Sequence, residues 1–123
     1  MFRIKRAYEP AHERDGVRVL VDRIWPRGKS KADLKIDHWL KDLAPSAALR
    51  RWFNHDAQKW TEFRARYAKE LDLKPKAIAF LVSLDDGLVT LVFAARDVEH
   101  NNAVALTAYL AQAVTSRGSR IRR

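Results

Sequence analysis

The most continuous apolar segment of the chain is residues 88–95, which read Leu-Val-Thr-Leu-Val-Phe-Ala-Ala. The near absence of polar alternation predicts a strand covered on both faces, as in a mainly parallel sheet with helices packed on each side. Residues 96–102 follow directly and are polar except for Val98, and residues 103–114 have a helical pattern. Open α/β sheets bind ligands beyond the carboxyl ends of their strands. The end of this strand is therefore the first candidate for a functional site.

Three other segments are apolar enough to pair with this strand. Residues 2–8 alternate between apolar and polar side chains, and residues 17–24 are rich in β-branched residues, so both are predicted strands. The second of them runs into Trp25-Pro26-Arg27-Gly28, a turn by its proline and glycine. Residues 36–43 have a periodicity that suits either a strand or a helix, and they end at Ala44-Pro45-Ser46.

Helices are predicted between these segments and the strand at 88–95. Ser30 is expected to cap a short helical turn, Ser46 a helix that ends near Phe53, and Asp56 the helix after it. Residues 75–84 form a further helix with proline in its first turn, and a last helix begins near Val98. An apolar stripe, expected to face the core, is formed by Trp60, Phe63, Tyr67 and Leu71.

This order of elements predicts an α/β fold with a mainly parallel sheet flanked by helices. The chain has 123 residues, of which 47% are hydrophobic, enough for the core of one compact domain. We place that domain at residues 1–114 and a flexible basic tail at residues 115–123. The tail contains Arg117, Arg120, Arg122 and Arg123 and no acidic residue. It is expected to be solvated and to add non-specific affinity for polyanions.

Charge and composition narrow the function further. The formal net charge of +9 favours acidic partners such as nucleic acid, nucleotides or phosphorylated metabolites. The absence of cysteine excludes disulfides, thiolate nucleophiles and sulfur-ligated metals, and it suits a reducing cytoplasm. Apolar stretches are far shorter than the about 20 residues of a membrane span, and no signal-peptide core begins the chain. We therefore expect a cytoplasmic protein without membrane association.

Common nucleotide and hydrolase motifs are missing from the chain. It contains neither a Gly-x-Gly-x-x-Gly nor a phosphate-loop motif, and no Gly-x-Ser-x-Gly nucleophile elbow. Asp97 and His100, with Asp22 or Asp37 as a third ligand, have a spacing that is common by chance, so no metal is expected. The pattern indicates no particular cofactor and no oligomeric state.

Three polar loops follow the three apolar segments that can be neighbouring strands. If these strands are parallel, the loops meet at one edge of the sheet, and this convergence is the central functional prediction. Trp25, Ser46 and Asp97 also have purely structural interpretations, as a packed turn and as helix caps. The candidate ligand-binding residues are Trp25, Arg27, Ser46, Arg96, Asn101 and Asn102, and the candidate catalytic residues are Asp97 and His100.

The side chains suggest what such a site can bind. Arg27 and Arg96 can each hold a phosphate or carboxylate through their forked donors. Asp97 lies three residues before His100, so its carboxylate can orient the imidazole and favour its charged form, while the positive end of the last helix opposes that charge. Asn101 and Asn102 supply neutral donors and acceptors of the kind that orient a base, an amide or a sugar.

Four runs of the chain resemble the signature runs of the YeaO-like family, bacterial proteins with a domain of unknown function 488. These runs are residues 18–28, residues 40–46, Leu49-Arg50 with Trp52-Phe53, and residues 94–103 without Val98. The resemblance covers about residues 3–113 and implies a small cytoplasmic α/β protein, but it supplies no reaction. Phe93 departs from the family, which often has a tyrosine there, so a phenolic hydroxyl is absent at this position.

Two functional hypotheses follow. The first is a protein that binds a phosphorylated or nucleotide-like anion at the strand ends, with Arg27 and Arg96 holding the anion and Asp97 with His100 available for acid–base catalysis. The alternative is a non-catalytic nucleic-acid-binding module, in which the basic surface supplies affinity and Trp25 supplies stacking. We favour the first, because the distinctive polar residues gather at strand ends.

Overall fold

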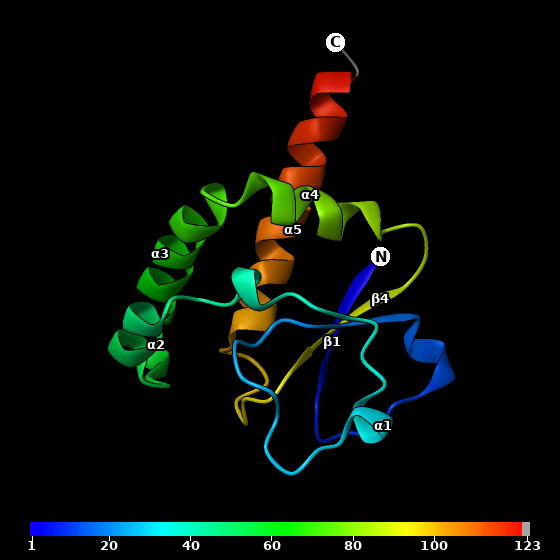
Figure 1. Cartoon of the computed structure of the whole chain (residues 1–123). Helices are drawn as coiled ribbons and strands as arrows, with labels where there is room; N and C mark the ends of the chain where they lie inside the picture. Colours follow the sequence, from blue (N-terminus) through cyan, green and yellow to red (C-terminus); the bar gives the residue numbers. More distant parts are fainter. Residues whose placement is uncertain (122–123) are drawn as a thin grey trace.

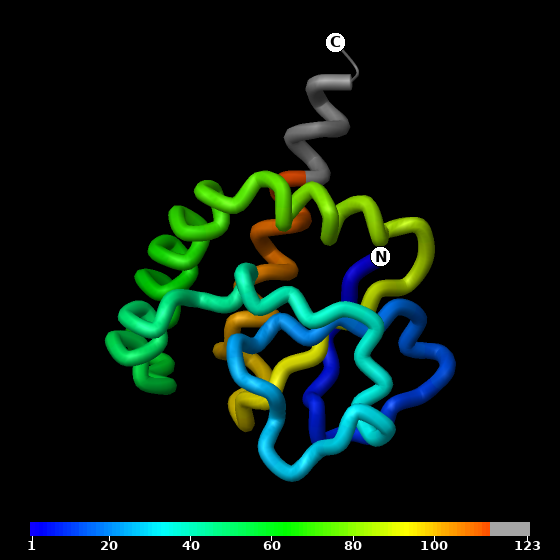
Figure 2. Tube along the Cα trace, in the orientation of Figure 1, coloured from blue at the N-terminus to red at the C-terminus, as the bar shows by residue number. Residues whose placement is uncertain are grey.

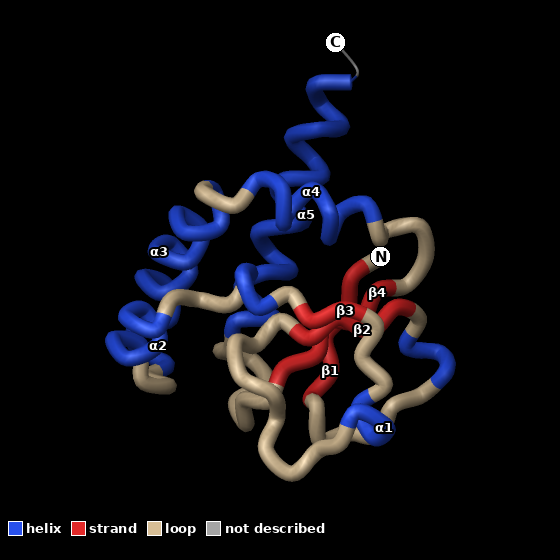
Figure 3. Tube along the Cα trace, viewed as in Figure 1, coloured by secondary structure: helices blue, strands red, loops and turns tan. Residues whose placement is uncertain are grey.

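A four-stranded parallel sheet forms the centre of the protein in a computed structural model, which describes the backbone of residues 1–121 and the side chains of residues 1–113. The strands are β1 (Phe2–Arg6), β2 (Val17–Leu20), β3 (His38–Trp39) and β4 (Val89–Phe93), in the spatial order β1-β4-β2-β3 (Figure 3). Strand β1 runs beside β4, as the adjacent blue and yellow segments of Figure 2 show. The predicted α/β class with a parallel sheet is confirmed.

Five α-helices complete the described fold (Figure 1). They are α1 (Lys31–Leu34), α2 (Ala47–Phe53), α3 (Trp60–Asp72), α4 (Pro75–Ser83) and α5 (Asn102–Ile121). The hydroxyls of Ser30 and Ser46 accept hydrogen bonds from the backbone of Asp33 and Leu49, so both predicted caps are present. Short 3₁₀ turns occupy Glu13–Asp15, Lys41–Leu43 and Ala57–Lys59. None of the helices in the described part of the chain is long and apolar enough to cross a membrane.

Strand β4 occupies the interior of the sheet, between β1 and β2. Leu91 pairs with Ile4 on one side and with Val19 on the other, and all five residues of β4 are buried. Both faces of this strand are covered, so it has no solvent-facing position that would need a polar residue. The nearly continuous apolar run in the sequence has this physical cause, and its one polar residue, Thr90, is buried with its hydroxyl donating to the carbonyl of Asp15.

The two faces of the sheet are covered differently. One face packs on α2 to α5, and the apolar stripe of α3 contributes Phe63, Tyr67 and Leu71 to that core. On the other face Leu20 and Val92 pack against Leu34 of α1 and the surrounding loops. Helices therefore flank the sheet as predicted, but the second face carries only the short helix α1.

Several boundaries differ from those predicted. Strand β2 ends at Leu20 rather than at residue 24, so Asp22 belongs to the following loop. The ambiguous segment 36–43 contains both a short strand, β3, and a 3₁₀ turn. Helix α5 begins at Asn102, after a turn at residues 98–101, and its backbone continues to Ile121. The side chains of the predicted basic tail lie outside the described residues, so the tail stays a prediction.

A charged network is buried on the loop-covered face of the sheet. Asp15 is inaccessible to solvent and accepts hydrogen bonds from Arg3 Nη2 at 2.5 Å, Lys5 Nζ at 3.1 Å and Arg18 Nη1 at 2.7 Å. Burial alone would raise the pKa of Asp15, but hydrogen bonds from the His12 backbone and from Lys5 and Arg18 lower it to about 2. The carboxylate therefore stays ionised and joins β1 to β2.

Candidate functional site

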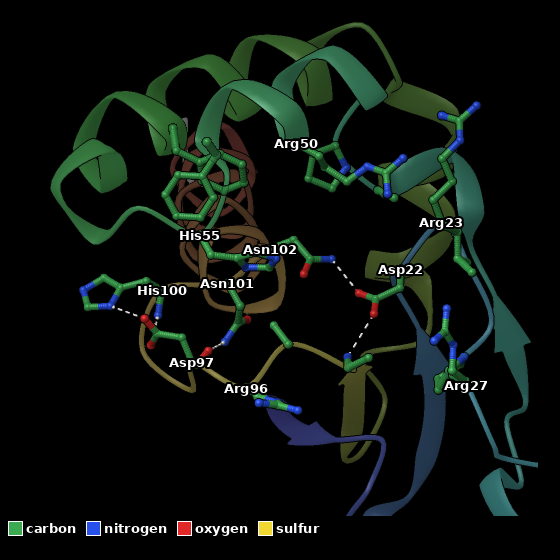
Figure 4. Close-up of a pocket in the computed structure, with 18 of the residues that line it drawn as sticks. Asp22, Arg23, Arg27, Arg50, His55, Arg96, Asp97, His100, Asn101 and Asn102 are labelled. Atoms are coloured by element: carbon green, nitrogen blue, oxygen red, sulfur yellow. Dashed lines mark hydrogen bonds and ion pairs between the residues drawn. The ribbon is translucent and has the colours of Figure 1, made fainter.

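A cavity of about 700 Å³ lies beyond the carboxyl ends of β2 and β4, where Figure 4 shows the side chains that line it. Its volume is in the range of sites that bind drug-sized ligands. The three polar loops that the sequence predicts to converge all contribute to its wall. The lining residues are 22–27, Ala44, Pro45, Arg50, Phe53, His55, Phe63, 94–97 and 100–102.

Four arginines from three parts of the chain reach the cavity. Arg23 and Arg27 come from the loop after β2, Arg50 from α2 and Arg96 from the turn after β4. All four are exposed, and their guanidinium groups make no hydrogen bond or ion pair with any residue of the described structure. Sequence reasoning identified Arg27 and Arg96, which lie on the same cavity as predicted, and missed Arg23 and Arg50. Their charges are left to interact with solvent or with a bound anion.

Asp22 connects the end of β2 to β4 and α5. Its Oδ2 accepts a hydrogen bond from Ala94 N at 2.9 Å, and its Oδ1 accepts one from Asn102 Nδ2 at 3.0 Å (Figure 4). Burial raises the pKa of Asp22, while these hydrogen bonds and the charge of Arg50 oppose the increase. Asn102 Nδ2 also donates to the carbonyl of Val21. Sequence reasoning considered Asp22 only as a metal ligand, although its place directly after a buried apolar run was a usable signal.

The turn between β4 and α5 is also held by hydrogen bonds from β1. Arg6, the last residue of β1, donates from Nε to the carbonyl of Ala95 at 3.0 Å and from Nη2 to that of Ala94 at 3.4 Å. The amide of Ala94 is bound by Asp22 at the same time. The backbone that presents Arg96 to the cavity is therefore fixed by side chains from two other strand ends.

Asp97 and His100 form a pair at the edge of the cavity. Asp97 Oδ1 accepts hydrogen bonds from the amides of Glu99 and His100, and Oδ2 lies 3.0 Å from His100 Nδ1. The backbone hydrogen bond from Glu99 and the contact with His100 lower the pKa of Asp97. The His100 ring also meets Trp60 edge-on, with 5.3 Å between centroids. Asp97 therefore stays ionised, caps the turn at residues 98–100 and orients His100.

Asn101, and not Asp97, caps α5. Its Oδ1 accepts a hydrogen bond from Val104 N at 3.0 Å, and its Nδ2 donates to the carbonyl of Asp97 at 2.8 Å. The prediction that Asp97 caps this helix is wrong, because the turn at residues 98–101 separates Asp97 from the first helical turn. Asn101 is buried, and both ends of its amide are already paired. Its arrangement is that of a structural cap at the cavity wall.

Trp25 and Ser46 have mainly structural contacts. The indole of Trp25 donates to the carbonyl of Lys29 at 2.6 Å and packs against Trp39, with 5.4 Å between ring centroids, although Trp25 does line the cavity. Ser46 does not line it: its hydroxyl caps α2 and donates to Glu70 at 2.7 Å. The structure therefore assembles seven of the eight predicted site residues and leaves Ser46 at a contact between α2 and α3.

Aromatic residues provide an apolar part of the cavity wall. Phe53 and Phe63 line the cavity and stack with 4.3 Å between centroids, and Trp60 stacks on Phe63 at 5.7 Å. His55 reaches the cavity directly after α2, with a left-handed φ of 55°. Sequence periodicity assigned Phe63 to the core, which is also correct, but it carried no signal for His55.

Comparisons with known proteins show relatives along nearly the whole chain. A sequence profile of the family described as the inactive DUF488-N3 subclade matches residues 1–121. Uncharacterized protein Rv3073c of Mycobacterium tuberculosis is 43% identical over 109 residues, covering 88% of this chain and 92% of the relative. Uncharacterized protein YeaO of Escherichia coli is 38% identical over 109 residues, covering 86% and 93%. No solved structure matches. These relatives confirm the predicted resemblance to the YeaO-like family.

Proposed function

This chain belongs to the family described as the inactive DUF488-N3 subclade, and we propose that it is a binding protein whose strand-end cavity takes a phosphorylated, nucleotide-like anion. The observation that carries the proposal is the gathering of Arg23, Arg27, Arg50 and Arg96 on one cavity, where their guanidinium groups make no hydrogen bond or ion pair within the described structure. Four like charges repel one another, and a bound anion relieves that repulsion.

The chemistry of these arginines suits an oxyanion. A guanidinium presents forked N–H donors that match two oxygens of a phosphate or carboxylate, and such charge-assisted hydrogen bonds are stronger than neutral ones. The amino-terminal end of α5, whose dipole favours negative charge, contributes Asn102 to the same cavity. The ligand thus meets positive potential from side chains and from the backbone.

Acid–base catalysis is not required by this arrangement. The oxygens of Asp97 are bound to local amides and to His100, and its pKa is lowered, so it is poorly suited to accept a proton. Burial raises the pKa of Asp22, but its carboxylate holds the backbone of Ala94 and the side chain of Asn102 in place, which is a positioning role. The description of the family as inactive supports binding rather than turnover.

The proposal is tested by isothermal titration with AMP at low ionic strength. Arg96→Ala and Arg27→Ala should each weaken binding about tenfold or more, because a charge-assisted hydrogen bond contributes about 1.5–3 kcal/mol. Arg51→Ala is the matched control: it removes the same charge from an exposed position of α2 that does not line the cavity. The proposal is wrong if the wild-type protein does not bind AMP at millimolar concentration, or if Arg51→Ala weakens binding as much as Arg96→Ala.

If the protein instead binds nucleic acid through its basic surface, the same arginine variants should differ from each other in another way. Binding of a single-stranded oligonucleotide through a general basic surface falls steeply with salt and depends on the number of charges, not on their position. Arg51→Ala and Arg96→Ala would then weaken binding equally. If the ligand binds in the cavity, only Arg96→Ala should lose affinity, because Arg96 lines the cavity and Arg51 does not.

A further inference from the structure

The cavity is larger and more varied in chemistry than a site for inorganic phosphate needs. At about 700 Å³ it accommodates a drug-sized molecule, and a lone phosphate would fill only a small part of it. Phe53 and Phe63 are buried, with 6% and 2% of their surface exposed, and they add a small apolar part of the wall that makes no favourable contact with a bare anion. The occupant should therefore carry a flat or apolar part as well as a negative charge.

The charges of the cavity are unevenly distributed. Figure 4 shows Arg23 and Arg27 on one side and Asp97 with His100 across from them, with Asp22 between the two groups. A phosphate bound near Asp97 would be opposed by its charge, whereas one beside Arg23 and Arg27 would be attracted. This distribution gives the ligand a preferred orientation, with its anionic end toward the guanidinium groups of Arg27 and Arg96 and away from the carboxylate of Asp97.

Asp22 adds a second requirement. A carboxylate has about four lone-pair sites, and Asp22 receives two hydrogen bonds, from Ala94 and Asn102. The remaining capacity can accept N–H or O–H donors of a ligand, while the negative charge opposes a second phosphate nearby. Asp22 therefore selects a molecule with hydrogen-bond donors next to a single phosphate.

From this combination we propose that the occupant is a nucleoside monophosphate and that Asp22 is the specificity-determining residue. This inference rests on the proposed function. The phosphate binds the arginines, sugar hydroxyls or an exocyclic amino group donate to Asp22, and the base lies toward Phe53 and Phe63. Phe53 and Phe63 stack on each other and are buried, so they give the base an apolar contact without reading its identity, and the recognition of hydrogen-bond donors is assigned to Asp22.

The test is a ligand series measured by isothermal titration. We expect the tightest of AMP, GMP, CMP and UMP to bind at least tenfold more strongly than ribose 5-phosphate or inorganic phosphate. Asp22→Asn should lower the affinity for that nucleotide about tenfold, and it should leave the affinity for inorganic phosphate unchanged or a few-fold higher because a like charge is removed.

Asp42→Asn is the matched control, because it removes the same charge from an exposed position that does not line the cavity. It should preserve the preference for nucleotide over phosphate. If inorganic phosphate or ribose 5-phosphate binds wild-type protein as tightly as the nucleotides, the inference is overturned while the proposed function stands. If Asp22→Asn weakens phosphate and nucleotide equally, Asp22 has only a structural role and its assignment is overturned. If none of these anions binds, the proposed function itself is wrong.

Discussion

Replacing Asp15 with asparagine removes the only negative charge of a buried network that contains Arg3, Lys5 and Arg18. In this variant the guanidinium group of Arg18, whose side chain is 4% exposed, would be left without a counter-ion. Breaking a buried ion pair by removing one partner costs about 3–5 kcal/mol. Because Arg3 is 45% exposed and partly screened by solvent, we expect Asp15→Asn to lower the free energy of unfolding at pH 7 by about 3 kcal/mol.

The pH dependence gives an independent measure of the same network. The pKa of Asp15 falls from 3.8 to about 2 on folding, a shift worth about 2.5 kcal/mol at full value and about 1–2 kcal/mol after solvent screening. A lowered carboxyl pKa stabilises the fold above the unfolded value. That contribution is lost as the pH falls from about 5 toward 2.

Urea denaturation at several pH values between 7 and 2.5 checks both numbers. Asp33→Asn serves as control, since Asp33 is an exposed capping residue of α1 with a lowered pKa but no ion pair in the described structure. Between pH 5 and 2.5 the free energy of unfolding of Asp15→Asn should fall by about 1–2 kcal/mol less than that of the wild-type protein. The reasoning would be refuted if acid lowered the free energy of unfolding equally in the wild-type protein and in Asp15→Asn. It would also be refuted if Asp15→Asn cost less than about 1 kcal/mol at pH 7.

Three other substitutions have distinct expected effects in denaturation and titration experiments. Gly16→Ala should lower the free energy of unfolding by more than about 2 kcal/mol, because φ is +66° and a Cβ atom would lie 2.1 Å from the carbonyl oxygen of Leu88; an unchanged denaturation midpoint would contradict this. Ser46→Ala should lower the free energy of unfolding by about 1 kcal/mol through the lost cap and the lost hydrogen bond to Glu70, and it should leave the affinity for AMP unchanged. A large loss of affinity would show that Ser46 contributes to binding. His100→Ala should change stability by less than about 1 kcal/mol, since its ring is 30% exposed at the cavity edge; global unfolding would mark His100 as a core residue.

Sequence patterns predicted those features that depend on local chemistry or on simple burial. The buried strand β4, the caps Ser30 and Ser46 and the inward stripe of α3 each have a signature within a few residues. The convergence of the loops followed from the parallel arrangement of strands, because their carboxyl ends share one edge.

Features that depend on long-range packing could not be predicted. Arg50 and His55 reach the cavity because α2 packs on α3 above the strand ends, and no local pattern encodes that placement. The contact of Ser46 with Glu70, 24 residues away, decides that the hydroxyl faces α3 rather than the cavity. Asp97 and Asn101 both have the chemistry of a cap, and only the path of the turn decides which of them begins α5.

The turn after β4 is held by contacts that do not involve the side chain of Arg96, so the shape of the cavity and the charge on its wall depend on different residues. Arg6 holds the carbonyls of Ala94 and Ala95, so the path of this turn does not depend on the side chain at position 96. Arg96 makes no hydrogen bond or ion pair with another described residue. Replacing Arg96 should therefore leave the fold and the path of this turn unchanged, while it alters the charge that the turn presents to the cavity.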